Sequence, residues 1–209
     1  MTRAALLLAL TSLLAVPTPA APPARYIIYV HGRIIEDQGR RPTSPDFGTY
    51  EYDAILDTLR RAGFVVLSDQ RPPKANAVSF ATRVAAQVDS LLGAGVPARA
   101  ITVVGFSKGG WIAILASARI RNPDISYVFL GACGAWAFEP SLHVTGRLLS
   151  LYEASDSLGT SCGPMFAHGA PGTRTREVRL HTGLRHGAFF RPDDAWLRPV
   201  IAWAGGREP

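Results

Sequence analysis

The sequence predicts an α/β fold in which helices cover both faces of a mostly parallel, six-stranded sheet. Six short apolar runs, rich in β-branched and aromatic residues, alternate with amphipathic helical patterns along its 209 residues. Continuous apolar runs are typical of strands buried on both faces of a parallel sheet. Strand–helix alternation with short connections is typical of the same fold class. Hydrophobic residues make up 47% of the chain and charged residues 18%, which excludes an intrinsically disordered protein.

The elements can be assigned one by one along the chain. We expect strands at residues 26–31, 64–68, 101–106, 127–132, 148–153 and 177–181. The spacing of apolar residues predicts helices over residues 51–62, 77–93, 108–119 and 193–204, and Pro199 leaves the start of the last one open. Residues 34–48 are polar and hold two prolines and two glycines, so we expect a long loop there. It follows the end of the first strand, where ligands bind in open α/β sheets.

The first 20 residues have the three-part pattern of a secretory signal peptide. Arg3 supplies a positive charge, residues 4–16 are almost wholly apolar, and residues 18–20 end in the small residues that a signal peptidase requires. We expect cleavage after Ala20, which leaves residues 21–209 as a single domain, secreted or periplasmic and without a membrane anchor. An uncleaved anchor is the alternative, although the apolar run is shorter than the roughly 20 residues of a spanning helix.

The chain is basic, with a formal net charge of +6, but its basic residues are scattered. Of the 22 basic residues only Lys74 and Lys108 are lysines, and the arginines are scattered, with RR pairs but no basic block. Because nucleic-acid binding depends on a concentrated basic surface, we expect no nucleic-acid partner. The sequence gives no indication of the oligomeric state.

The strongest functional motif is Gly105-Phe106-Ser107-Lys108-Gly109-Gly110, which we call the serine elbow. It matches the pattern G-x-S-x-G between a predicted strand and a predicted helix, the context that this pattern requires. Small residues around the serine let neighbouring backbone approach a strained turn. The hydroxyl then lies at a helix N-terminus, where negative charge is stabilised. The alternative is a small-residue turn in which Ser107 has no catalytic role.

A nucleophilic serine needs a base, and the base needs an acid that orients it. We favour His186 as the base because it lies in a loop just after the last predicted strand, with His181 as the alternative. We favour Asp156 as the acid because it lies in the loop after the preceding strand, with Glu153 at that strand's end as the alternative. The other interpretation of these acids is that they are solvated loop charges. For His143 and His168 we expect structural roles.

In this chain order, Ser107, Asp156 and His186 resemble the catalytic residues of the α/β-hydrolase superfamily. The resemblance also rests on His31-Gly32 after the first strand and on Gly187 after His186, and it spans roughly residues 25–205. It implies a compact α/β-hydrolase whose oxyanion hole is formed by two backbone N–H groups, those of Lys108 and Arg33.

The chain departs from the family pattern in two respects. Two strands that usually begin the family's sheet are missing, and the segment 134–147 has only 14 residues, too few for a helical lid. We therefore expect an open site, with substrate contacts from Gly32, Trp136 and Phe138.

The resemblance also yields expectations for individual side chains. The Arg33 side chain either attracts an anionic substrate or is a surface arginine. The Lys108 ammonium should point into solvent, because the helix dipole repels it. His31 should brace the loop of the oxyanion hole. Because the family topology makes the preceding strands neighbours, Cys133 and Cys162 should form a disulfide, two buried free thiols being the alternative.

The sequence thus predicts a secreted serine hydrolase that cleaves an ester or related acyl bond of a small molecule through an acyl-enzyme. It predicts no cofactor, and no metal site because no cluster of metal ligands is present. One alternative is a non-catalytic binding protein with the same fold. Another is a thioesterase or peptidase, which differs only in its substrate, because a fold alone does not determine chemistry.

Overall fold

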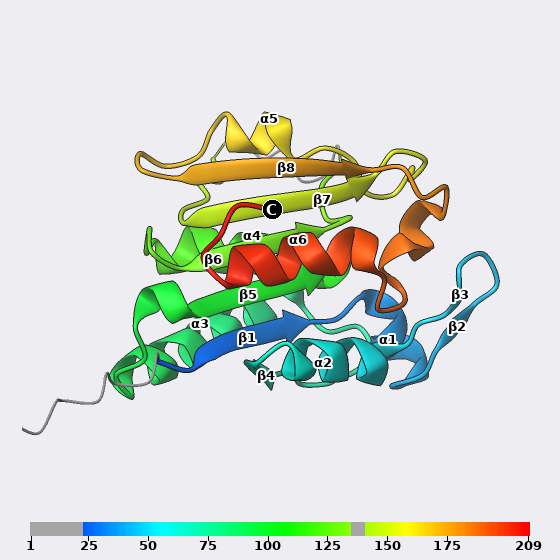
Figure 1. Ribbon diagram of the computed structural model, residues 1–209, viewed down its shortest axis with the longest axis horizontal. Helices are drawn as coiled ribbons and strands as arrows, with labels where there is room; N and C mark the ends of the chain where they lie inside the picture. The colour runs from blue at the N-terminus through cyan, green and yellow to red at the C-terminus, as the bar shows by residue number, and fades with distance from the viewer. Residues whose placement is uncertain (1–22, 135–140) are drawn as a thin grey trace, which may run out of the picture.

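The computed structural model describes residues 23–134 and 141–209, and its centre is one six-stranded sheet (Figure 1). The strand order is β4-β1-β5-β6-β7-β8, and every neighbouring pair is parallel. The strands are β1 (Arg25–Val30), β4 (Phe64–Leu67), β5 (Ile101–Phe106), β6 (Ser126–Leu130), β7 (Arg147–Glu153) and β8 (Arg174–Leu180). The predicted fold class is therefore confirmed, and so are all six predicted strands.

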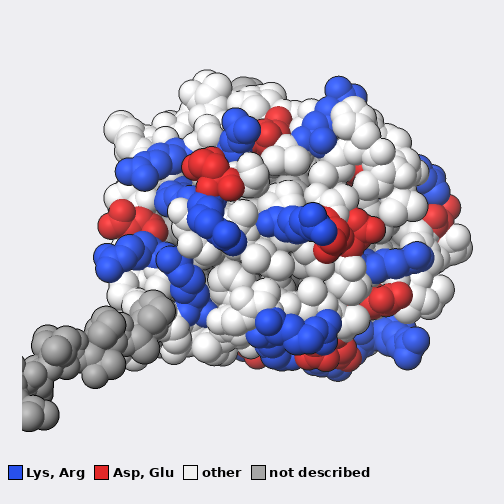
Figure 2. All heavy atoms as spheres, viewed as in Figure 1, with Lys and Arg blue, Asp and Glu red and all other residues white. Residues whose placement is uncertain are grey.

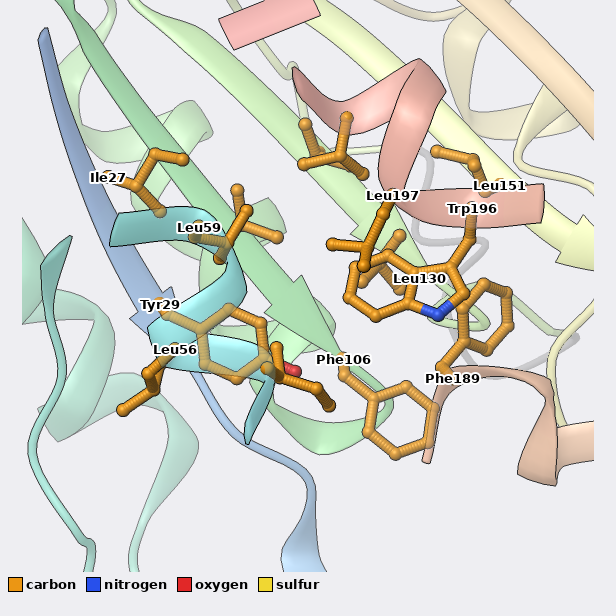
Figure 3. Packing of buried hydrophobic residues seen from close by; sticks show 14 of the residues in the cluster. Ile27, Tyr29, Leu56, Leu59, Phe106, Leu130, Leu151, Phe189, Trp196 and Leu197 are labelled. Atoms are coloured by element: carbon orange, nitrogen blue, oxygen red, sulfur yellow. The ribbon is translucent and has the colours of Figure 1, made fainter. Parts of the chain in front are cut away.

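Helices cover both faces of this sheet (Figure 1). Apolar side chains of α2 (Tyr52–Arg61) and α6 (Asp194–Ala204) pack on one face, and those of α3 (Ala77–Gly93) and α4 (Lys108–Ile120) pack on the other. Figure 3 shows the first of these cores, where Trp196 of α6 lies against Leu130 and Phe189. No helix in the described residues is long and apolar enough to cross a membrane.

The expectation of a long loop over residues 34–48 is wrong. This segment contains the short helix α1 (Arg33–Gln38) and a hairpin of β2 (Thr43–Ser44) and β3 (Gly48–Thr49). Helix α1 forms because Ile35 packs in the core and the buried Glu36 carboxylate pairs with two cationic side chains, those of Arg71 and Lys108. The remaining short elements are α5 (Gly163–Phe166) and the 3-10 helices η1 (Ala98–Ala100) and η3 (Arg185–Phe189).

Charged side chains of both signs are interspersed on the face seen in Figure 2. Basic residues there alternate with Asp and Glu rather than forming one continuous patch. The predicted signal peptide, residues 1–20, lies outside the described residues.

Candidate active site

Ser107 lies in a strained turn between β5 and α4. Its backbone has φ 53° and ψ −120°, a conformation that few residues other than glycine adopt. A Cβ atom on Gly105 would overlap the backbone of Gly109, and one on Gly109 would overlap the carbonyl oxygen of Val30. The two glycines of the motif are therefore required by close backbone contacts, as expected for a serine elbow.

His186 and Asp156 are hydrogen-bonded to each other. The Nδ1 atom of His186 lies 2.6 Å from Oδ2 of Asp156, and both residues are buried. The second carboxylate oxygen of Asp156 accepts a hydrogen bond of 2.8 Å from the Leu158 N–H. Because Nδ1 donates to a carboxylate, the free Nε2 is the atom left to accept a proton.

The His186 ring lies beside the serine elbow. Its centroid is 4.9 Å from that of Phe106, the residue before Ser107, and 6.0 Å from that of Phe47 in the β2–β3 hairpin. A Cβ atom on Gly131, after β6, would lie 3.3 Å from Cε1 of the same imidazole, so only a small residue fits there without crowding the ring. No hydrogen bond joins Ser107 Oγ to His186, both of which are described residues. Such bonds are often long in the absence of substrate.

The two candidate N–H donors of an oxyanion hole are the first residues of two helices. Arg33 begins α1 directly after Gly32, and Lys108 begins α4 directly after Ser107. N–H groups in the first turn of a helix have no partner within the helix, so they can bind an anion. Gly32 lies against the Phe106 ring, because a Cβ there would be 2.9 Å from Phe106 Cδ1. Both helix starts therefore flank the serine elbow.

No family model matches this sequence, and no curated protein matches it. Solved structures do match. A protein from Klebsiella pneumoniae described as a dienelactone hydrolase aligns with a TM-score of 0.59 and 16% identity, over 90% of each chain. MGS-M1, an α/β-hydrolase enzyme from a Medee basin deep-sea metagenome, aligns with a TM-score of 0.57 and 14% identity, over 88% of this chain and 84% of its own. Arabidopsis thaliana SOBER1 aligns with a TM-score of 0.57 and 11% identity, over 88% and 99%.

This chain has the α/β-hydrolase fold. Identities this low establish the fold alone, and the chemistry has to be argued from the site. In this α/β-hydrolase fold, the ends of β5, β7 and β8 bring Ser107, Asp156 and His186 to one edge of the sheet. Trp136 and Phe138, two of the predicted substrate contacts, are outside the described residues.

Glu153, the alternative acid, has a different place in the α/β-hydrolase fold. Its buried carboxylate accepts hydrogen bonds from Thr182 (N–H and hydroxyl, both 2.9 Å), Gly183 and Ser155. Burial by itself would raise the pKa of Glu153, but these hydrogen bonds outweigh it and hold the pKa below its usual value. Glu153 therefore anchors the loop that leads from β8 to His186. The alternative base, His181, lies exposed in that loop.

The predicted disulfide is confirmed. Cys133, after β6, is bonded to Cys162, with their Cα atoms 5.2 Å apart. Cys133 also accepts a backbone hydrogen bond from Thr160, and the Cys162 N–H donates to Glu177 of β8. The acid loop (residues 154–162), which carries Asp156, is thus fastened to the neighbouring strands.

The expectation for the Lys108 side chain is wrong. Its ammonium nitrogen lies 2.6 Å from Oε2 of Glu36, and the side chain is only 22% exposed. Glu36 is fully buried, so its attraction for the ammonium outweighs the helix dipole. The Arg33 side chain is 71% exposed and pairs with Asp37, which makes it a surface arginine.

His31 is a buried structural residue. Nδ1 is hydrogen-bonded to the Gly32 carbonyl at 2.8 Å, and Nε2 accepts a 2.9 Å hydrogen bond from the Arg71 N–H. Burial and the neighbouring Arg71 lower the pKa of His31 to about 4, so the ring is neutral at pH 7. The Arg71 and Glu36 partners were missed by sequence reasoning, because they lie far apart in the chain and belong to no motif.

A hollow of about 180 Å³ lies next to the loop that carries His186 and is lined by Phe47, Leu184, Arg185 and Arg191 among others. Ser107, Asp156 and His186 are not among its lining residues. A larger hollow of about 610 Å³, lined by His143, Thr145 and His168, lies near the opposite strand ends. In the described residues no group of three or more His, Cys, Asp and Glu side chains is placed to hold a metal ion.

Proposed function

We propose that this protein is a serine hydrolase that cleaves an ester or related acyl bond. The observation that carries the proposal is the buried Asp156–His186 hydrogen bond beside Ser107 on its strained turn. A binding protein has no need of a carboxylate-oriented imidazole next to a serine at a helix N-terminus.

In the proposed reaction, Ser107 Oγ attacks the acyl carbonyl while His186 Nε2 takes its proton. The carbonyl electron pair moves onto oxygen, where the N–H groups of Lys108 and Arg33 stabilise the negative charge. As the tetrahedral intermediate collapses, His186 gives its proton to the departing alcohol and an acyl-enzyme remains. Water, deprotonated by His186, then attacks the carbonyl of the acyl-enzyme and forms a second tetrahedral intermediate. As this intermediate collapses, the carboxylic acid leaves and His186 returns the proton to Ser107 Oγ. Asp156 holds the imidazole tautomer throughout and stabilises the imidazolium.

The proposed substrate is a small soluble ester. The segment 134–147 has only 14 residues, too few for a helical lid. A site without a lid is poorly suited to a long acyl chain. We also propose that residues 1–20 direct the enzyme out of the cytoplasm, which suits a protein with a Cys133–Cys162 disulfide.

The test is the intact mass of the protein after treatment with a small fluorophosphonate. We expect one covalent adduct on the wild type and none on Ser107→Ala, together with a loss of esterase activity of several orders of magnitude in the variant. The variant should fold normally, because the hydrogen bonds between Ser107 and other described residues are made by its backbone. A well-folded wild type that forms no adduct would contradict the proposal and favour a non-catalytic binding protein.

A further inference from the structure

The proposed oxyanion hole draws its two N–H groups from different helices. Arg33 begins α1 and Lys108 begins α4, so their separation depends on how these two helices are held together. Donors stabilise an oxyanion only if they are fixed to within about half an ångström. One contact holds the start of α4 directly against the chain that leads into α1: the Gly109 backbone packs against the carbonyl oxygens of Val30 and His31.

The second connection between α1 and α4 is made by the side chain of Glu36. This residue lies three positions after Arg33 on α1, and its side chain has no exposed surface. One carboxylate oxygen lies 2.6 Å from the ammonium of Lys108, and the other lies 2.7 Å from Nε of Arg71. A single carboxylate therefore joins α1 to α4 and to the chain that follows β4.

Arg71 extends this link to the residues just before Arg33. Its guanidinium donates a 2.5 Å hydrogen bond to the His31 carbonyl, and its backbone N–H donates to His31 Nε2. The chain leading into Arg33 is thus bonded to the same arginine that Glu36 holds. Hydrogen bonds between charged groups are the strongest in proteins, and burial strengthens them further.

We infer that Glu36 is a positioning residue that fixes the two N–H groups of the proposed oxyanion hole relative to each other through Lys108 and Arg71. The inference rests on the proposed serine hydrolase function. Glu36 does not touch the substrate, so its loss should slow the steps that form an oxyanion and leave substrate binding little changed. If the cluster served stability alone, folded variants would keep wild-type kinetics.

The experiment compares four variants with the wild type: Glu36→Gln, Lys108→Met, Lys108→Arg and Asp37→Asn. The readouts are kcat and KM for p-nitrophenyl acetate, the rate of fluorophosphonate labelling, and Tm. We expect Glu36→Gln and Lys108→Met to lower kcat and the labelling rate about 10–100-fold, less than the loss of a whole donor, with KM within threefold. Lys108→Arg should keep most of the wild-type kcat and labelling rate that Lys108→Met loses, because a guanidinium can also reach Glu36.

Asp37→Asn is the matched control. Asp37 is the next residue of α1, but it is 43% exposed and its ion pair within the described residues is with the exposed Arg33, so the variant should behave like the wild type. Folded Glu36→Gln and Lys108→Met proteins that label at the wild-type rate would overturn the inference, and so would a failure of Lys108→Arg to recover activity.

The outcomes for the inference and for the proposed function are separable. Failure of the wild type itself to label would refute the hydrolase proposal, whereas normal labelling of both wild type and variants refutes only the role of Glu36. If Glu36→Gln does not fold, Lys108→Met decides alone, because it leaves the buried Glu36–Arg71 pair in place.

Discussion

Ser107 is a residue whose backbone conformation works against stability. A non-glycine residue at φ 53° and ψ −120° costs on the order of 1–3 kcal/mol and persists only where the surroundings impose it. Here the surroundings are three glycines: Gly105 and Gly109 contact backbone, and Gly110 contacts the Ala132 side chain. A glycine at position 107 would adopt this backbone conformation without strain. That the chain has a serine there instead indicates that its hydroxyl has a function.

The first prediction at this scale concerns Gly109. In Gly109→Ala the new methyl group would overlap the carbonyl oxygens of Val30 and His31, which are backbone atoms that cannot rotate away. We expect a loss of more than about 2 kcal/mol in the free energy of unfolding in urea, with loss of fluorophosphonate labelling. The matched control is Gly93→Ala at the end of α3, where a Cβ meets no atom within 4 Å. Equal stability of the two variants would contradict this account.

Residue types and their chain positions predicted the pairing of Asp156 with His186, because loops after neighbouring parallel strands meet at one sheet edge. They did not predict the direction of the Lys108 side chain. Its partner Glu36 lies on another element, and nothing in the local sequence indicates that this carboxylate is buried. Ion pairs between distant segments leave no periodic pattern in a sequence, so only the fold reveals them.

At the scale of the elements, the loops after β6, β7 and β8 are fastened to one another. The Cys133–Cys162 disulfide and Glu177 hold the acid loop, and Glu153 holds the loop that leads to His186. The local sequence of residues 34–48 predicts a loop rather than helix α1, because contacts with distant residues stabilise this helix. Helix α1 is only six residues long, too short for helical periodicity to be recognised, and tertiary contacts stabilise it.

The disulfide supplies the prediction at the scale of the elements. It closes a segment with a sequence separation of 29, so replacing both cysteines by serine should lower the free energy of unfolding by about 3–4 kcal/mol. The acid loop would also be less firmly held, and we expect esterase activity to fall several-fold. Urea unfolding and p-nitrophenyl acetate turnover measure the two effects. Wild-type protein reduced with a phosphine should have the same free energy of unfolding and the same turnover as the double variant. If neither protein is less stable than the oxidised wild type, the hydrogen bonds of the acid loop hold it without the disulfide.

At the scale of the whole molecule, the sheet was predictable because every strand except the two at its edges is covered on both faces. Burial on both faces requires a nearly continuous apolar run, and β5 is buried at all six positions. The edge strand β8 has three arginines and a glutamate and is mostly exposed, so its start at Arg174 was placed three residues too late. Apolar patterns therefore locate the centre of the sheet better than its edges.

The buried ionisable groups make the stability of the whole molecule depend on pH. The pKa of His31 is about 4 in the folded protein, against 6.5 for an unperturbed histidine. Between these values the unfolded chain binds a proton that the folded protein does not, so acidification favours unfolding. The stability contribution is complete above pH 6.5 and is lost progressively as the pH falls toward 4.

We therefore expect the free energy of unfolding of the wild type to fall between pH 6.5 and pH 4, with His31 contributing a slope of at most about 1.4 kcal/mol per pH unit. In His31→Asn the slope around pH 5.5 should be shallower, whatever the variant's stability at neutral pH. A further loss is expected below about pH 4.5, where protonation removes the advantage of the hydrogen-bonded Glu153 carboxylate. Urea unfolding at half-unit pH intervals measures both slopes. Identical slopes around pH 5.5 in the two proteins would mean that His31 accepts its proton without unfolding, and that the Arg71 N–H finds another acceptor.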